Sequence, residues 1–96
     1  MKNSSVQEFS SVLDSLIQNL GIRTKLEQYS IFELWAETVG EQIARVTAPE
    51  RIENGVLIVR VSAAPWRTEL VFRKKEVLEK IHAAMKSQVI TDIRFR

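Results

Sequence analysis

One short segment combines aromatic rings with positive charge, which is the mixture that single-stranded nucleic acid requires. It runs from Trp66 to Lys75 and reads Trp-Arg-Thr-Glu-Leu-Val-Phe-Arg-Lys-Lys. Cations hold phosphates and aromatic rings stack on bases, so this segment is a candidate nucleic-acid surface. The candidate nucleic-acid-binding residues, including one from the preceding apolar run, are Arg60, Arg67, Arg73, Lys74 and Lys75. Basic side chains that only face solvent are the alternative interpretation.

Two aromatic residues of this segment are candidates for contact with a partner. Phe72 falls outside the apolar arc of the helix expected here, which favours a partner anchor over a core position. Trp66 stands where a strand passes into a helix, so it either covers the hairpin or serves as an exposed stacking platform. Trp35 shares an apolar stripe with Phe32 and Val39, and we expect it in the core.

Enzyme chemistry has no recognisable group set in this sequence. The one histidine, His82, has no acid or nucleophile in a catalytic arrangement, and we interpret it as a solvated or packing residue. The three glycines stand alone at positions 21, 40 and 55, so there is no glycine-rich phosphate loop. We therefore predict no catalytic residue, no metal site, no cofactor, no small-molecule substrate and no ATP hydrolysis.

Length and composition predict one globular domain over residues 1–96, with residues 1–4 loose. Hydrophobic residues make up 45% and charged residues 27%, which is ordinary for a folded protein. The net charge is +2, but residues 1–50 carry four Lys/Arg against seven Asp/Glu and residues 51–96 carry ten against five. The halves are therefore −3 and +5, and the basic half can attract an anionic partner.

The cysteine content and the N-terminal residues indicate in which cellular compartment the protein is expected. There is no cysteine, and the start of the chain lacks the apolar run of a signal peptide. No segment approaches the ~20 apolar residues that span a bilayer. We expect a cytoplasmic protein without a membrane partner.

Helical periodicity predicts the elements before the first turn. A first helix carries Val6, Phe9, Leu13, Leu16, Ile17 and Leu20 on one face. Ser5 and Glu8 fit a capping box at its start, and Gly21 fits a left-handed stop. A second helix begins near Thr24, ends before Pro49, and is expected to kink or break at Gly40. Its apolar face carries Phe32, Trp35, Ala36, Val39, Ile43 and Val46.

A hairpin, a long helix and a last strand follow. Asn54-Gly55 lies between Arg51–Glu53 and Val56–Val61, which predicts a tight β-turn with Leu57, Val59 and Val61 facing the helices. A helix from Pro65 to Met85 precedes a strand within Val89–Arg96, where Arg94 and Arg96 share a face. The predicted fold class is α+β, with helices on one face of a small three-stranded sheet, in the order α-α-β-β-α-β.

In the helix expected from Pro65, two basic residues fall at positions where the helical period predicts apolar ones. At about 100° per residue, Arg67 and Lys74 fall inside the apolar arc that is centred between Leu70, Ile81 and Met85. Two unpaired buried charges are too costly, so we expect the first two turns to overhang the core, with charged heads in solvent or on a ligand.

Taken together, the residues at the turns and on the apolar stripes resemble the DciA family, and the likeness covers nearly the whole chain. They are Trp35, Val39-Gly40, Ile43-Ala44, Thr47, Pro49, Asn54-Gly55, Ser62, Trp66 and Glu69-Leu70. The resemblance implies a KH-like domain that binds the replicative DNA helicase, helps it load onto DNA and has some affinity for nucleic acid.

Two departures limit what the resemblance implies. KH domains clamp nucleotides with a Gly-X-X-Gly loop, which this sequence lacks, so nucleic acid must use another surface. Many family members also carry a long flexible extension, so we expect any helicase contact of these 96 residues to come from the folded domain. The leading hypothesis is a non-enzymatic helicase adaptor that also touches single-stranded DNA. The alternative is a stand-alone module that binds RNA or DNA.

Overall fold

The computed structural model describes residues 2–19 and 21–96, and the side chains of residues 7–16 and 21–96. Within these ranges the elements are α1 (Lys2–Asn19), α2 (Ile22–Val39), α3 (Glu41–Ala44), β1 (Thr47–Glu53), β2 (Val56–Val61), α4 (Ala64–Phe72), α5 (Lys74–Met85) and β3 (Asp92–Phe95). The predicted α+β class and element order are confirmed, although two of the predicted helices are each divided into two.

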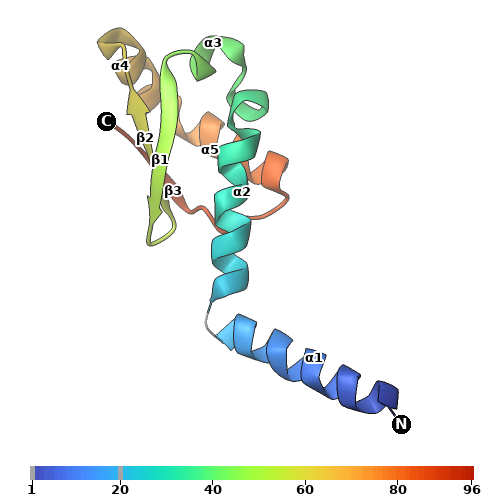
Figure 1. Ribbon diagram of the computed structural model, residues 1–96. Coiled ribbons are helices and arrows are strands. Elements are labelled where there is room, and N and C mark those ends of the chain that lie inside the picture. The colour runs from blue at the N-terminus through green and yellow to red at the C-terminus, as the bar shows by residue number, and fades with distance from the viewer. Residues whose placement is uncertain (1, 20) are drawn as a thin grey trace.

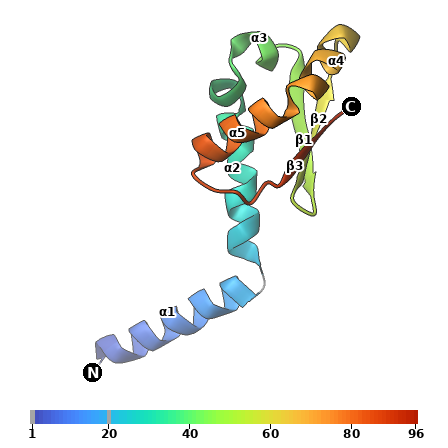
Figure 2. The same ribbon diagram turned by 180° about the vertical axis from the view of Figure 1, so that it is seen from behind.

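The sheet has the strand order β1-β2-β3, with β1 and β2 antiparallel and β2 and β3 parallel. Helices α2 and α5 cover one face, while the opposite face carries no helix from the described residues (Figures 1 and 2). Asn54 and Gly55 form the predicted turn, both at positive φ (51° and 82°).

The core lies between the sheet and helices α2 and α5, because side chains alternate between the two faces of a strand. Leu57, Val59 and Val61 point into it, as predicted from the period of β2. The other buried members of this core are Ile31, Trp35, Val39, Ile43, Leu70, Val77, Ile81, Ile90, Ile93 and Phe95.

Two breaks correct the predicted helices. The second helix stops at Gly40, as expected, but α3 then ends at Ala44 and strand β1 begins at Thr47, so Pro49 lies within an edge strand rather than after a helix. The helix expected from Pro65 to Met85 is interrupted at Arg73, whose ψ of 10° departs from helical geometry. One continuous apolar arc therefore does not run through both Arg67 and Lys74, and the argument for an overhang of that helix was wrong.

Helix α1 leads away from the sheet and the other helices (Figure 1). It begins at Lys2, three residues before the predicted cap at Ser5, and Gly21 adopts the predicted left-handed conformation (φ 72°). The predicted capping box is therefore wrong, because an N-cap residue precedes its helix and Ser5 lies within α1. The side chains of Val6, Ile17 and Leu20 lie outside the described set, and a loose start at residues 1–4 stays a prediction.

We expect Gly40→Ala to lower the free energy of unfolding by about 1–3 kcal/mol, because Gly40 (φ 89°, ψ 159°) occupies a region that is essentially restricted to glycine. A Cβ there would meet no described atom within 4 Å, so the cost would be backbone strain alone. Denaturant unfolding measures the change, with the exposed Gln42→Ala as control. A Gly40→Ala protein as stable as that control would contradict the strain.

Candidate nucleic-acid and partner surfaces

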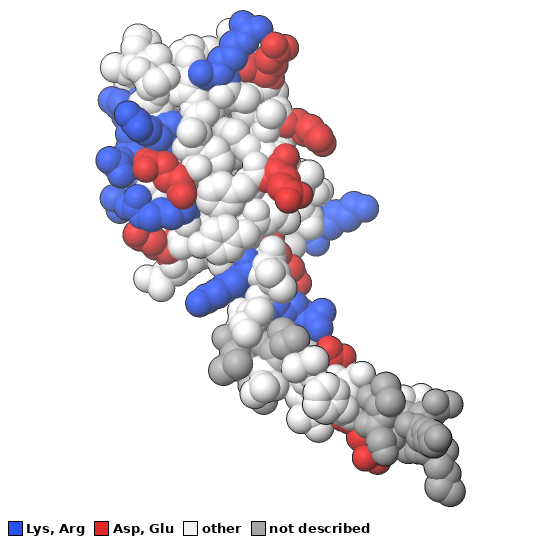
Figure 3. Space-filling view, in the orientation of Figure 1, with Lys and Arg blue, Asp and Glu red and all other residues white. Residues whose placement is uncertain are grey.

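The sheet face away from α2 and α5, called the open face below, is built by strand register. Ala48 on β1 lies opposite Arg60 on β2, and Ile58 on β2 lies between Arg51 on β1 and Arg94 on β3. Alternation places Asp92 and Arg96 on the same side as Arg94. The charged residues of the open face are Glu50, Arg51, Glu53, Arg60, Asp92, Arg94 and Arg96, and blue side chains gather on that side of the molecule (Figure 3).

The open face is not a bare polar surface, because Ile58 within it is only 1% exposed. Its cross-strand neighbours on both sides are arginines, Arg51 and Arg94. We attribute the burial of Ile58 to their long apolar stems, which cover hydrocarbon while the charged heads stay in water. The stems therefore hold the guanidinium groups above the middle of the sheet.

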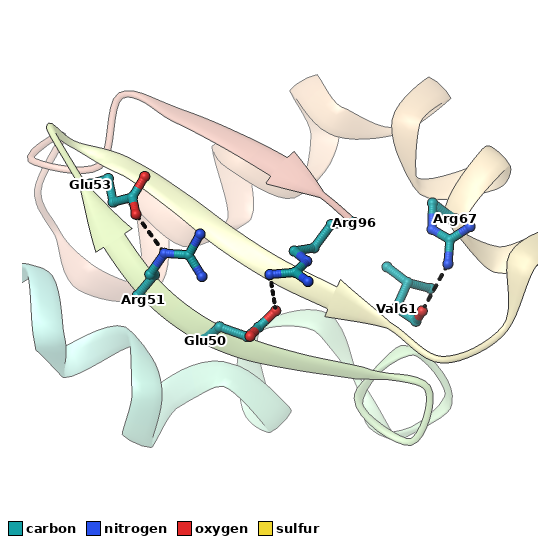
Figure 4. A network of polar contacts seen from close by, with 6 residues as sticks. All are labelled: Glu50, Arg51, Glu53, Val61, Arg67 and Arg96. Carbon is teal, nitrogen blue, oxygen red and sulfur yellow. Dashed lines mark hydrogen bonds and ion pairs between the residues drawn. The ribbon is translucent and has the colours of Figure 1, made fainter.

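Two of the four open-face arginines are neutralised by ion pairs (Figure 4). Nε of Arg51 donates to Oε1 of Glu53 at 2.5 Å, and this hydrogen bond lowers the pKa of the Glu53 carboxyl and raises the pKa of Arg51. Nη1 of Arg96 lies 3.5 Å from Oε1 of Glu50 on β1. Arg60 and Arg94 form no ion pair within the described part of the chain, so they are available to an anionic ligand.

A hollow of about 250 Å³ adjoins Arg60 at one end of the open face. Its lining residues are Arg45, Val46, Thr47, Ala48, Arg60 and Ser62. Arg45 reaches Glu41 at 2.8 Å on its own helix, so Arg60 is the one cation of this hollow that has no ion-pair partner in the described residues. The hollow therefore offers an anion a single free guanidinium.

Arg67 lies at the end of β2 and is half-buried. Its Nη2 donates to the carbonyl oxygen of Val61 at 3.2 Å (Figure 4), while its Nε is buried without a hydrogen-bond partner among the described atoms. The side chain thus joins α4 to the last residue of β2. This is a structural contact, so Arg67 is engaged within the fold.

The other three predicted cations lie at the junction of α4 and α5. Arg73 pairs with Glu69 at 2.8 Å, and Lys74 reaches Asp92 on β3 at 3.4 Å. Lys75 is exposed and forms no ion pair that the described residues record. The structure therefore divides the predicted set, with Arg60 alone on the open face and Lys74 linking the helix junction to the β3 edge.

Sequence reasoning placed Arg94 and Arg96 on one face but left them out of the site, together with Arg51. The signal was their alternation with Ile93 and Phe95, which are buried. What could not be read locally was that β1 and β3 both pair with β2 and bring Arg51, Arg60 and Arg94 together across the chain.

A second candidate surface lies on α4. Phe72 is 83% exposed and Val71 is 52% exposed, so two consecutive apolar residues of α4 are accessible to solvent. A hollow of about 230 Å³ lies on the same helix. It is lined by Pro65, Trp66 and Glu69 of α4 and by Arg73, the residue that follows α4. Trp66 itself is half-buried against the core, so its apolar ring forms part of the hollow rather than a free platform.

Other candidate features have structural roles. Trp35 is 4% exposed, as expected of a core residue. Nε2 of His82 lies 2.6 Å from the carbonyl oxygen of Ile90 and ties α5 to the segment before β3. Within the described residues, no group of three or more acidic, histidine or cysteine side chains could hold a metal ion. None of the described helices is both long and apolar enough to cross a membrane.

Comparison with known proteins gives consistent matches along the chain. The sequence model of the family described as "Dna[CI] antecedent, DciA" matches residues 8–95. UPF0232 protein ML0004 of Mycobacterium leprae (strain TN) is 32% identical over 88 residues, which are 92% of this chain and 47% of the relative. UPF0232 protein RHA1_ro03670 of Rhodococcus jostii (strain RHA1) is 27% identical over the same shares. The chain thus spans about half the length of these curated relatives. Since the family match covers nearly all of its residues, the chain belongs to the DciA family.

Proposed function

We propose that this chain is a non-enzymatic adaptor that binds the replicative DNA helicase and assists its loading, with weak binding of single-stranded nucleic acid. Family membership supports the adaptor role. The observation that carries the helicase contact is the exposure of Phe72, which is 83% accessible although its helix packs on the sheet through Leu70. Exposed aromatic anchors are typical of protein–protein contact sites.

Weak affinity for nucleic acid follows from the charges of the open face. Four arginines share that face with three carboxylates, and two of the arginines are paired with Glu50 and Glu53. Each phosphate contact adds affinity that depends on salt, so two free cations provide only a small electrostatic contribution. This suits an adaptor that has to release the strand to the helicase.

The helicase contact is tested with the purified helicase of the same organism, by size exclusion with light scattering and by calorimetry. We expect a shared peak with wild type and at least about tenfold weaker binding by Phe72→Ser, because exposed aromatic anchors contribute upwards of ~1.4 kcal/mol. Glu79→Ala, an exposed change on α5, is the control and should bind like wild type. No association at tens of micromolar, or unchanged binding by Phe72→Ser, would remove the basis for this contact.

A stand-alone nucleic-acid module is the second candidate, favoured by the two unpaired open-face arginines, Arg60 and Arg94. It predicts that a single-stranded oligonucleotide elutes with the small protein while the helicase elutes separately. A ternary peak that needs both helicase and oligonucleotide would instead favour the adaptor.

A further inference from the structure

Helix α1 exposes an apolar stripe that the described part of the chain leaves uncovered. Phe9 is 70% exposed, Val12 67%, Leu13 45% and Leu16 51%. Their spacing of three, four and seven residues places them on one side of the helix. Every described side chain of α1, from residue 7 to residue 16, is exposed. Because most helical stability in proteins comes from packing of an apolar face, α1 is expected to gain from a surface that covers this stripe.

The first turns of α2 expose a second apolar stripe. Ile22 is 40% exposed, Leu26 69% and Tyr29 51%, again at helical spacing. The ring of Tyr29 stacks on Phe32 at a centroid distance of 5.4 Å, which fixes its orientation. A groove of about 530 Å³ beside Tyr29 separates this part of α2 from the β1–β2 turn. The α2 stripe is therefore ordered, accessible and flanked by a hollow.

The two stripes match each other in length. Phe9 to Leu16 and Ile22 to Tyr29 each cover eight residues, and the seven steps between their ends rise about 10 Å along a helix. Each stripe combines one aromatic ring with aliphatic side chains. Two such faces can pack against each other with neither stripe extending beyond the other.

The two stripes also carry complementary charge. Residues 7–16 of α1 hold Glu8 and Asp14 and no basic residue, with Lys2 two turns before the stripe, whereas the first two turns of α2 hold Arg23 and Lys25 against one acid, Glu27. At 100° per residue, Glu8 borders the α1 stripe and Arg23 and Lys25 lie on either side of the α2 stripe. Packing of the stripes therefore brings opposite charges to the rim, where they favour a correct partner.

Within one chain, α1 extends away from α2 (Figure 1), and the side chains of both stripes remain exposed. A second copy related by a twofold axis would place α1 of each chain on α2 of the other, so both stripes of both chains would be covered at once. Such an interface is closed, and exchange of an identical element is a low-cost route to a dimer.

We propose that the stripe of Phe9, Val12, Leu13 and Leu16 on α1 docks on the stripe of Ile22, Leu26 and Tyr29 of a second copy of this chain. This dimer is independent of the helicase and of nucleic acid. It joins two domains through their helices and leaves both open faces and both α4 surfaces accessible.

Light scattering on the purified chain alone, from 10 µM to 1 mM, tests the dimer. We expect wild type to reach twice the 11.0 kDa mass of one chain. Leu13→Asp on α1 and Leu26→Asp on α2 should each weaken association at least tenfold. Both sites are exposed, so thermal unfolding should show an intact domain. Phe72→Ser, an exposed change on α4, should leave the dimer intact.

A charge exchange tests the pairing of α1 with α2. Glu8→Lys alone and the double variant Arg23→Glu with Lys25→Glu should each weaken the dimer, and an equimolar mixture of the two proteins should associate more tightly than either alone. Wild type that stays at the mass of one chain up to 1 mM would overturn the proposal, whether α1 folds back on its own α2 or binds another protein. A dimer that Leu13→Asp does not weaken would overturn it as well.

Discussion

Replacing Trp35 with alanine is expected to lower the free energy of unfolding by about 3–5 kcal/mol, the range for removal of a large buried ring. Trp35 is 4% exposed on α2, and its Nε1 donates to Oγ1 of Thr47 at 3.0 Å. Thr47 in turn donates to the carbonyl oxygen of Ile43 at 2.7 Å. The indole therefore fills the core and also fixes the start of β1 against α2 and α3. In a domain of this size, such a loss lowers the melting temperature by more than about 10 °C.

Two further variants help to interpret the loss: one separates packing from hydrogen bonding at Trp35, and the other compares Trp35 with the second tryptophan. Trp35→Phe keeps an aromatic ring but loses the donor to Thr47, and we expect it to cost about 1 kcal/mol from the hydrogen bond, with any poorer ring packing added to that. Trp66→Ala removes the half-buried tryptophan and should cost less than Trp35→Ala. Chemical denaturation monitored by circular dichroism measures all three. Equal losses for Trp35→Ala and Trp66→Ala would contradict a core role specific to Trp35.

Charge reversal of the two unpaired open-face arginines should produce the largest change in nucleic-acid binding. The double variant Arg60→Glu with Arg94→Glu loses two phosphate contacts, each of which contributes about 0.7 to the salt slope for a single strand. At about 0.15 M salt this loss alone weakens binding roughly 15-fold, and repulsion by the new carboxylates weakens it further. Fluorescence anisotropy with a labelled single-stranded oligonucleotide at several salt concentrations gives both the affinity and the slope.

The control for this prediction is Lys80→Glu with Lys86→Glu, which changes the net charge equally but acts on α5 and its C-cap residue. If binding depended only on net charge, both double variants would lose affinity to the same extent. We expect the α5 variant to retain most of it. A salt slope that the Arg60 and Arg94 reversals leave unchanged would place the nucleic acid elsewhere, with the α4–α5 junction around Lys75 as the next surface to test.

Local sequence signals were sufficient wherever a single residue dictates the backbone. Asn54-Gly55 produced the tight turn and Gly40 ended a helix, because each needs a positive φ. The alternation within β2 correctly assigned Leu57 to the core face. These features depend on near neighbours in the sequence, so one sequence was enough to find them.

The features that were missed depend on contacts between distant segments. Arg73 is a good helix former with no glycine or proline beside it, yet the helix breaks there, and α4 lies against β2 and β3 while α5 lies against α2 and β3. Thr47 was assigned to the end of a helix, but pairing with Val61 made it the start of a strand. The open face also depends on such pairing, so its arginines could not be grouped by local spacing. Phe72 was correctly identified as lying outside the apolar arc, and its exposure is the part of the candidate partner site that the sequence predicted.

The geometry of β1 has a consequence for aggregation. An edge strand offers unpaired backbone groups to strands of other molecules, and proteins limit this with proline or with irregular pairing. Pro49 lacks the backbone N–H that such pairing needs, and the register with β2 shifts between Pro49 and Arg51. Growth of fibril-like stacks from this side of the sheet is therefore disfavoured by the strand itself, without a further strand from the described residues pairing with this edge.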